Sequence, residues 1–202
     1  MKNEFRSIVD GSVYHLEAAE DSDPDLYNLV GKSTTLRELC ERMITVSSNL
    51  AANLLIEKLG VENIRRQVET LDATGMQVLR GVEDNKAYDR GLNNTTTARA
   101  LLQLLESIAQ GKAVSPEASR QMVTILSHQQ FSDAIPAGLP AGTAVAHKTG
   151  DITRINHDAA IVYGPRPFVL VILVRGMEER AQSSHLMAEI TRTLWDALRA
   201  ED

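Results

Sequence analysis

Cysteine is almost absent from this chain, since Cys40 is the only one among 202 residues. A disulfide within the chain and a cysteine-rich metal site are therefore excluded. Cys40 falls in an apolar helical stripe, so we expect it to act as a small buried hydrophobic residue. Aromatic residues are also scarce, at 4% against 43% for all hydrophobic residues. The core must therefore consist mostly of Leu, Ile, Val, Ala and Met.

Long hydrophobic runs are missing as well. No apolar stretch approaches the roughly 20 residues of a membrane-spanning helix, and the segment Met1–Arg6 is not followed by the apolar region of a signal peptide. The sequence as written predicts a cytoplasmic protein with no membrane partner. Basic residues are outnumbered, and the formal net charge is −6. Nucleic acid is therefore not an expected partner, because phosphate binding needs a basic surface.

Helical periodicity dominates the first two thirds of the chain. Thr35-Leu-Arg-Glu38 matches a capping box and precedes apolar residues at helical spacing. Further helices are predicted over residues 50–59, 62–71, 97–108 and 116–128. The segment 76–96 has little periodicity, and connections of that length inside a compact domain are often functional. The acidic run Glu17–Asp25 is expected to be a solvated loop; a calcium site is the alternative, although the spacing does not match an EF-hand.

The pattern then changes to short runs rich in β-branched residues. Strands are predicted over Thr143–His147, Asp158–Tyr163 and Phe168–Arg175, followed by a helix over 183–200. The predicted fold class is α+β: a single domain with a helical lobe over about 34–135, and a small antiparallel sheet with a C-terminal helix over about 141–202.

Three short motifs could carry chemistry. In chain order they are Ser47-Ser48-Asn49, Arg80-Gly-Val-Glu83-Asp-Asn85 and Lys148-Thr149-Gly150. Taken alone, each has an ordinary interpretation: a helix cap, a solvated glutamate, and a turn after the first predicted strand. Their order, spacing and placement together favour a catalytic interpretation.

These motifs resemble those of class A serine β-lactamases. Ile44-Thr-Val-Ser-Ser-Asn-Leu-Ala-Ala-Asn-Leu-Leu resembles the Ser-Asp-Asn region of that family, and His147-Lys-Thr-Gly150 resembles its Lys-Thr-Gly strand. The stretch Asn93–Thr97 is similar to the segment before the family's next helix. The resemblance runs from about residue 30 to the end. It implies a β-lactamase-like hydrolase of the penicillin-recognising fold, acting on a small-molecule substrate, in a family that is usually exported.

The resemblance also implies roles for individual residues. Ser47 would relay a proton to the leaving nitrogen, and Glu83 would position and deprotonate a water molecule. Lys148 would bind the substrate carboxylate. The remaining substrate-binding residues would be Asn49 for the amide, Thr149 for the carboxylate, and Gly150, whose backbone would contribute to an oxyanion hole.

The sequence departs from the family pattern in three ways. Ser48 replaces the aspartate of Ser-Asp-Asn, and the segment around Glu83 lacks the Arg-x-Glu-Pro-Glu shape. Most importantly, the family's Ser-x-x-Lys motif is missing. The residues three positions before Lys32, Lys58, Lys86, Lys112 and Lys148 are Leu29, Leu55, Glu83, Ala109 and Val145. We therefore expect the nucleophilic serine and its helix to be absent.

The missing segment has a structural consequence. In the resembling family, two N-terminal strands pair with the last strand of the sheet. Without them, the strand over 168–175 is expected to be an exposed apolar edge, and such edges recruit other chains. The sequence therefore predicts a homo-oligomer that shelters this edge.

The resemblance implies a substrate cleft, which would keep most of its polar residues but would have no acylating serine. His147 and His157 lie on strands that border it, and an imidazole beside a carboxylate could hold Zn²⁺, which generates hydroxide near neutral pH. The family resemblance itself requires no cofactor.

Three hypotheses follow. The chain is a hydrolase of esters, amides or phosphoesters that uses water activated in the vacated cleft, with zinc or without a metal. Alternatively, it is a non-catalytic binding module that recognises substrate through Lys148-Thr149-Gly150. In the third, it is an ordinary serine hydrolase whose Ser-x-x-Lys motif lies upstream of Met1.

Overall fold

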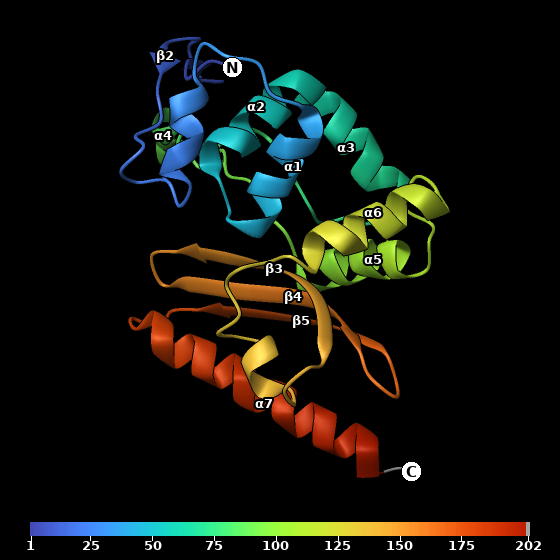
Figure 1. The fold of residues 1–202 in the computed structure, drawn as a ribbon. Helices are drawn as coiled ribbons and strands as arrows, with labels where there is room; N and C mark the ends of the chain where they lie inside the picture. Colours follow the sequence, from blue (N-terminus) through green and yellow to red (C-terminus); the bar gives the residue numbers. More distant parts are fainter. Residues whose placement is uncertain (201–202) are drawn as a thin grey trace. The chain divides into compact units, whose positions relative to one another are not determined.

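The protein has an α+β fold that divides into two compact units, one from Met1 to Ala100 and the other from Leu101 onward (Figure 1). This computed structural model describes residues 1–200. The fold class agrees with the prediction. The division falls at Ala100, whereas the sequence placed the end of the helical lobe near residue 135, so the helices over 101–126 group with the sheet.

The first unit is mostly helical. Its elements are the two-stranded antiparallel ribbon β1 (Phe5–Arg6) and β2 (Val13–Tyr14), the 3-10 helix η1 (Pro24–Leu29), and the helices α1 (Leu36–Thr45), α2 (Asn49–Leu59), α3 (Val61–Thr70) and α4 (Asn85–Asp89). The Thr35 hydroxyl caps α1 by accepting from the Glu38 backbone N–H at 3.0 Å. The reciprocal half of the predicted capping box does not form, because the Glu38 carboxylate accepts from Thr34 and Arg42 instead.

A core of aliphatic side chains holds the first unit together. Its buried members are Phe5, Leu16, Leu26, Leu39, Leu50, Ala51 and Leu55. Cys40 is half-buried and packs against this cluster, and burial raises the pKa of its thiol. A thiol in this setting is largely un-ionised at neutral pH, which agrees with the predicted role as a small hydrophobic residue.

The second unit is built on a three-stranded antiparallel sheet with the order β3-β4-β5. Its elements are α6 (Pro116–Leu126), η2 (Pro136–Gly138), β3 (Ala144–Ile152), β4 (Ile155–Tyr163), β5 (Phe168–Arg175) and α7 (Arg180–Ala200), and α5 (Ala98–Ala109) begins at the division. β5 has the predicted bounds. β3 runs five residues beyond its predicted end, and β4 begins three residues early.

The longer β3–β4 hairpin changes where Lys148-Thr149-Gly150 lies. These residues pair with Ala159, Asp158 and His157, so they sit inside β3 and not in a turn after it. Glycine and aspartate are poor strand formers, which is why the sequence pattern ended the strand too soon. Pairing along the whole hairpin outweighs that weak local preference.

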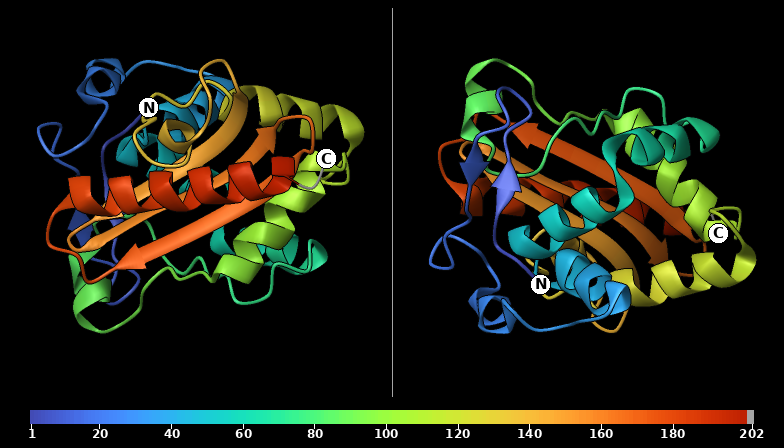
Figure 2. Two further views of the ribbon diagram at one scale, coloured as in Figure 1. Left: turned by 90° about the horizontal axis from the view of Figure 1, so that it is seen from below. Right: turned by 90° about the horizontal axis from the view of Figure 1, so that it is seen from above.

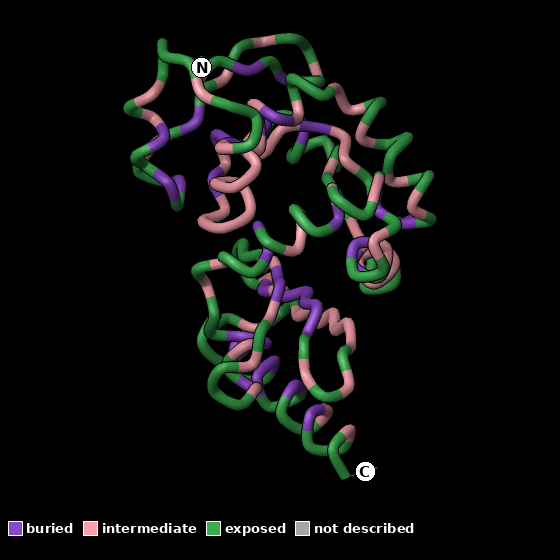
Figure 3. Tube along the Cα trace, turned by 45° about the vertical axis from the view of Figure 1, so that its right-hand side comes forward, coloured by how far each residue is buried: buried purple, intermediate pink, exposed green. Residues whose placement is uncertain are grey.

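α7 packs against one face of the sheet (Figure 2). Trp195 of α7 lies in a buried cluster with Ile135, Ala160 and Val162, and buried positions alternate with exposed ones along the helix (Figure 3). Gly138 of η2 lies so close to α7 that a Cβ there would overlap the Ala188 carbonyl oxygen. Over residues 1–200, no helix is both long enough and apolar enough to cross a membrane.

Candidate functional site

The turn between α1 and α2 presents Ser47 and Asn49. Ser47 has a φ of 58°, in the left-handed region that non-glycine residues seldom occupy. Ser48 is fully buried, and its hydroxyl accepts from the Ala51 backbone N–H at 3.3 Å. The serine that replaces the family's aspartate therefore acts as the N-cap of α2. A left-handed backbone such as that of Ser47 is often held at functional sites by the surrounding structure.

Asp21 holds the turn between α1 and α2 through hydrogen bonds to its backbone, a role that the sequence did not reveal. Its carboxylate accepts from the backbone N–H groups of Asn49 at 3.2 Å and Leu50 at 2.9 Å, and from the Tyr27 hydroxyl at 2.9 Å. A carboxylate at a helix N-terminus is favoured by the helix dipole. Asp21 is only 7% exposed, so the prediction of a solvated loop for the acidic run is wrong at this position.

Asp23 is a second exception within the acidic run. It is also 7% exposed, and both of its carboxylate oxygens lie 3.0 Å from Nη1 of Arg42 on α1. Two aspartates of the acidic run thus make internal structural contacts. Nothing in its spacing distinguished these two aspartates from their solvated neighbours.

Glu83 lies beside this turn. The Asn49 side-chain amide donates to Glu83 Oε1 at 2.8 Å. Glu83 also has a left-handed backbone, with a φ of 61°. Two predicted site residues that are 34 positions apart in sequence are therefore in direct contact.

Asn53, one turn after Asn49 on α2, fixes the loop that carries Glu83. Its amide oxygen accepts from the Val82 backbone N–H at 2.6 Å, and its amide nitrogen donates to the Val82 carbonyl at 3.0 Å. Asn53 is 1% exposed. Gly81 leaves room for this contact, because a Cβ there would lie 2.7 Å from Asn53 Oδ1 and 2.7 Å from the Tyr14 hydroxyl.

Two further side chains brace the same loop. The buried Arg80 guanidinium donates to the carbonyls of Leu92 and Gly81, each at 2.9 Å. The buried Asp84 carboxylate accepts from the Ile8 backbone N–H at 2.9 Å and caps α4. The segment 76–96, predicted only as irregular, is thus a tightly held loop with one short helix. Its cross-chain partners could not be read from local pattern.

The environment of Glu83 raises the pKa of its carboxyl group. Burial raises the pKa of the Glu83 carboxyl, the Asn49 hydrogen bond lowers it, and the nearby charges of Glu20, Asp21 and Glu17 raise it again. Burial is the largest of these effects, so the net direction is upward. A glutamate with a raised pKa is suited to exchange protons with a substrate or a water molecule near neutral pH.

A hollow of about 200 Å³ adjoins Glu83 within the first unit. Its lining is mostly polar and consists of Ser7, Ser12, Val13, Tyr14, His15, Glu17, Glu20, Glu83, Asp84, Asn85 and Lys86. It is large enough for several water molecules. Glu83 therefore has room for water beside it.

Lys148 lies on β3 in the second unit. Its ammonium donates to the Thr149 carbonyl at 2.6 Å. Burial lowers the pKa of Lys148 to about 8, while the charge of Asp158 acts in the opposite direction. Lys148 is therefore a mostly protonated but poorly hydrated cation at neutral pH, which suits it to bind an anionic group.

His147 and His157 point to opposite faces of the sheet. His147 pairs with Ala160 and His157 pairs with Gly150, so strand alternation separates their side chains. His147 Nδ1 lies 3.0 Å from Asp158 Oδ1, whereas His157 Nδ1 accepts from the Val174 N–H at 3.0 Å. The two imidazoles therefore do not meet at one site, and zinc binding by either one beside a carboxylate stays a prediction. Among residues 1–200 no group of three His, Cys, Asp or Glu side chains is placed to bind a metal ion.

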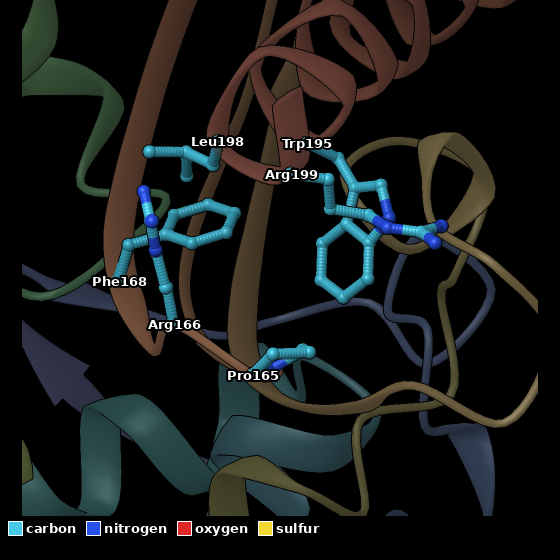
Figure 4. Close-up of a pocket in the computed structure, with 6 residues that line it drawn as sticks. All are labelled: Pro165, Arg166, Phe168, Trp195, Leu198 and Arg199. Atoms are coloured by element: carbon cyan, nitrogen blue, oxygen red, sulfur yellow. The ribbon is translucent and has the colours of Figure 1, made fainter. Parts of the chain in front are cut away.

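A shallow hollow at the far end of the sheet contains none of the predicted residues (Figure 4). It is lined by Pro165, Arg166, Phe168, Trp195, Leu198 and Arg199. In Figure 4 the Arg199 side chain runs beside the Trp195 ring, and Arg166 lies beside Phe168 on the other side of the hollow. The two guanidinium groups do not converge, so the hollow lacks the paired cations of an anion site.

Comparison with known proteins identifies relatives over most of the chain. The profile of the beta-lactamase enzyme family matches residues 12–198. Beta-lactamase AST-1 of Nocardia asteroides is 32% identical over 195 residues, which cover 92% of this chain and 63% of that protein. A beta-lactamase of Streptomyces albus G is 29% identical over 199 residues, covering 91% and 62%. The chain therefore spans slightly less than two thirds of the length of these relatives.

Solved structures give the same result. An ancestral class A beta-lactamase is 30% identical with a TM-score of 0.79, and the match covers 91% of this chain and 74% of that one. The protein described as PBP-A is 28% identical with a TM-score of 0.78, covering 86% of this chain and 65% of that one. Sequence and fold agree, and the chain belongs to the beta-lactamase enzyme family, with a class A serine beta-lactamase-like fold.

Proposed function

We propose that this protein hydrolyses a small anionic amide or ester, with Glu83 as the base that activates water. The observation that carries the proposal is the 2.8 Å hydrogen bond between the Asn49 amide and Glu83 Oε1. It joins the residue expected to bind the substrate amide to the residue expected to activate water. The family match supports hydrolysis as the general class of reaction.

The reaction would begin at Glu83. In its ionised form Glu83 takes a proton from water, and the hydroxide adds to the substrate carbonyl carbon. The proton held by Glu83 would then return to the leaving nitrogen or oxygen through Ser47, which gives up its own proton and takes the one from Glu83 as the bond to carbon breaks, so that both side chains regain their starting forms. Because burial raises the pKa of Glu83, activity should rise over a pH range above that of an ordinary glutamate.

Lys148 would bind the anionic group of the substrate, with Thr149 and Gly150 beside it on β3. The pKa of about 8 makes this binding sensitive to pH. Affinity should fall as the pH rises through 8, because the ammonium loses its charge.

Direct water attack is proposed because Glu83 is hydrogen-bonded to Asn49 and adjoins a hollow with room for water. The test is a panel of amide, ester and phosphoester substrates that includes nitrocefin, with mass spectrometry of the protein after each incubation. We expect turnover of a member of the panel other than nitrocefin, and no added acyl mass. Glu83→Gln should abolish turnover, while Glu117→Gln, on the exposed surface of α6, should not. An acylated protein would overturn direct water attack.

Metal assistance is a separate prediction. Because His147 and His157 face opposite sides of the sheet, no reaction step is assigned to zinc. EDTA should leave turnover unchanged. Loss of activity with EDTA and recovery with zinc would contradict the metal-free mechanism.

The second candidate function is binding without catalysis. The largely buried Lys148 ammonium on β3 favours it, since it suits recognition of an anionic group without chemistry, and Lys148 would then serve recognition alone. Binding of benzylpenicillin or another panel member to a folded sample, with no product formed, would support this function over hydrolysis.

We also propose that the protein associates with a second copy of itself through β5. Among the described residues β5 pairs only with β4, and its sequence from Phe168 to Val174 contains no charged residue to block a further strand. A second copy supplies an identical strand. In an antiparallel pair centred on β5, Arg166 of each copy approaches Glu178 and Glu179 of the other, so the charges at both ends are complementary.

The test of assembly is the molar mass in solution by light scattering. We expect a dimer that Val171→Lys dissociates, because a lysine in the middle of the strand edge opposes pairing. Leu186→Lys, at an exposed position on α7, is the matched control. A monomer at all concentrations would remove the proposal.

A further inference from the structure

A buried carboxylate lies directly behind the Lys148-Thr149-Gly150 segment. Asp158 of β4 pairs with Thr149 and is 0% exposed. Its Oδ1 lies 3.0 Å from His147 Nδ1, and its Oδ2 accepts from the Ile135 backbone N–H at 3.0 Å. One carboxylate therefore ties together β3, β4 and the segment that precedes η2.

His147 is the second member of this pair and is 3% exposed. The contact with Asp158 requires the Nδ1–H form of the ring, since a carboxylate can only accept. A buried carboxylate is costly unless it is hydrogen-bonded, so each of these contacts restrains its position. His147 precedes Lys148 in β3, and the restraint on its side chain also restrains the backbone beside Lys148.

Asp158 also acts on Lys148 electrostatically. Their side chains point to opposite faces of the sheet, and Asp158 is the charged group that opposes the effect of burial on the Lys148 pKa. Strand alternation places the titratable residues His157, Tyr163 and Arg175 on the same face of the sheet as Lys148. On α6, which packs against β3, the charged residues Glu117 and Arg120 pair with each other at the surface.

We propose that Asp158, held by His147 and the Ile135 N–H, is the positioning residue of the Lys148-Thr149-Gly150 segment. It fixes β3 in place, and its negative charge stabilises the Lys148 ammonium, which lies on the opposite face of the sheet. The inference rests on the proposed role of Lys148 as the cation that binds the anionic group of the substrate. It adds a pair of residues that would control when this cation is charged.

The experiment is an NMR titration of the ligand-free protein with labelled lysine. The chain has six lysines, and loss of one resonance in Lys148→Met assigns the signal. Asp158→Asn should lower the Lys148 midpoint by about one pH unit or more, the effect of removing a nearby opposite charge. Asp133→Asn, which removes a half-exposed carboxylate of the same unit, should leave the midpoint unchanged. An unchanged midpoint in folded Asp158→Asn would overturn the inference.

A second pair of variants covers the case in which Asp158→Asn does not fold. Glutamine in His147→Gln can still donate to Asp158, whereas leucine in His147→Leu cannot. Without this donor the carboxylate loses a hydrogen bond that holds it in place, so the Lys148 midpoint should fall in His147→Leu and be retained in His147→Gln. Equal midpoints in the two variants would contradict the proposal.

Ligand binding separates this inference from the proposed function. Calorimetry with benzylpenicillin at several pH values measures the affinity of the parent and of Asp158→Asn. It gives, for each protein, the pH above which binding is lost, which is its alkaline limit. A shifted Lys148 midpoint without binding of any panel substrate would leave the inference intact and remove the role of Lys148 in substrate recognition. Binding with the same alkaline limit in both proteins would overturn the inference and leave that role standing.

Discussion

Replacing Gly81 by alanine should dislodge the loop that carries Glu83. The φ of Gly81 is not positive, so alanine can adopt the backbone conformation. The obstacle is space: the added Cβ would lie 2.7 Å from Asn53 Oδ1, 2.7 Å from the Tyr14 hydroxyl and 3.0 Å from Asn53 Cγ. Asn53 is buried on α2, so its side chain must leave its present position.

The cost follows from the contacts that Asn53 makes. It would lose two hydrogen bonds to the Val82 backbone, of 2.6 and 3.0 Å. Each is worth about 0.5–1.5 kcal/mol, and a buried amide left unsatisfied costs about 1–3 kcal/mol. The free energy of unfolding should therefore fall by about 2–4 kcal/mol. For a protein of this size, that corresponds to a decrease in Tm of roughly 5–15 °C.

Calorimetry measures the change, with Gly150→Ala as the control. A Cβ at Gly150 would approach only His157 Cβ, at 3.9 Å, so its Tm should stay close to that of the parent. In Gly81→Ala the Asn49–Glu83 hydrogen bond should also be lost. Because that bond lowers the pKa of Glu83, the pKa should rise further, which carboxyl NMR can follow. A Tm within about 2 °C of the parent would show that Asn53 does not hold this loop.

Other perturbations test other parts of the structure. Gly138→Ala should destabilise the second unit by several kcal/mol, because its Cβ would overlap the Ala188 backbone oxygen, and urea denaturation measures this loss. Asp21→Asn removes the charge at the N-terminus of α2 and should lower the free energy of unfolding by about 1–2 kcal/mol; equal urea midpoints would refute that role. Lys148→Met should be more stable than the parent below pH 8, by at most about 3 kcal/mol. Since the folded pKa of Lys148 is about 8 and the unfolded value 10.5, the parent should gain stability as the pH rises between them, and the difference should disappear. A constant difference between the two proteins across this range would contradict the burial of Lys148.

Local sequence signals located most of the helices and strands correctly. Ser115 caps α6, with its hydroxyl accepting from the Ala118 N–H at 3.1 Å, and α2 ends at Gly60 as the pattern predicts. β5 has the predicted bounds, because a continuous apolar run rich in β-branched residues has no competing local preference. The β3–β4 hairpin was predicted too short. Residues 148–152 are held in β3 by pairing with β4, and their own strand preference is weak.

For the candidate site, the sequence supplied the identities of the residues and the tertiary structure decided their surroundings. Ser47, Asn49, Glu83 and Lys148 were found through a family resemblance carried by short motifs. The bracing residues Asp21, Asn53 and Asp158 were not found, because the sequence does not distinguish a buried polar residue from a solvated one. Only folding shows which carboxylate meets an N–H group. Strand register likewise decided that His147 and His157 face opposite ways, since a change of one position along a strand moves a side chain to the other face of the sheet.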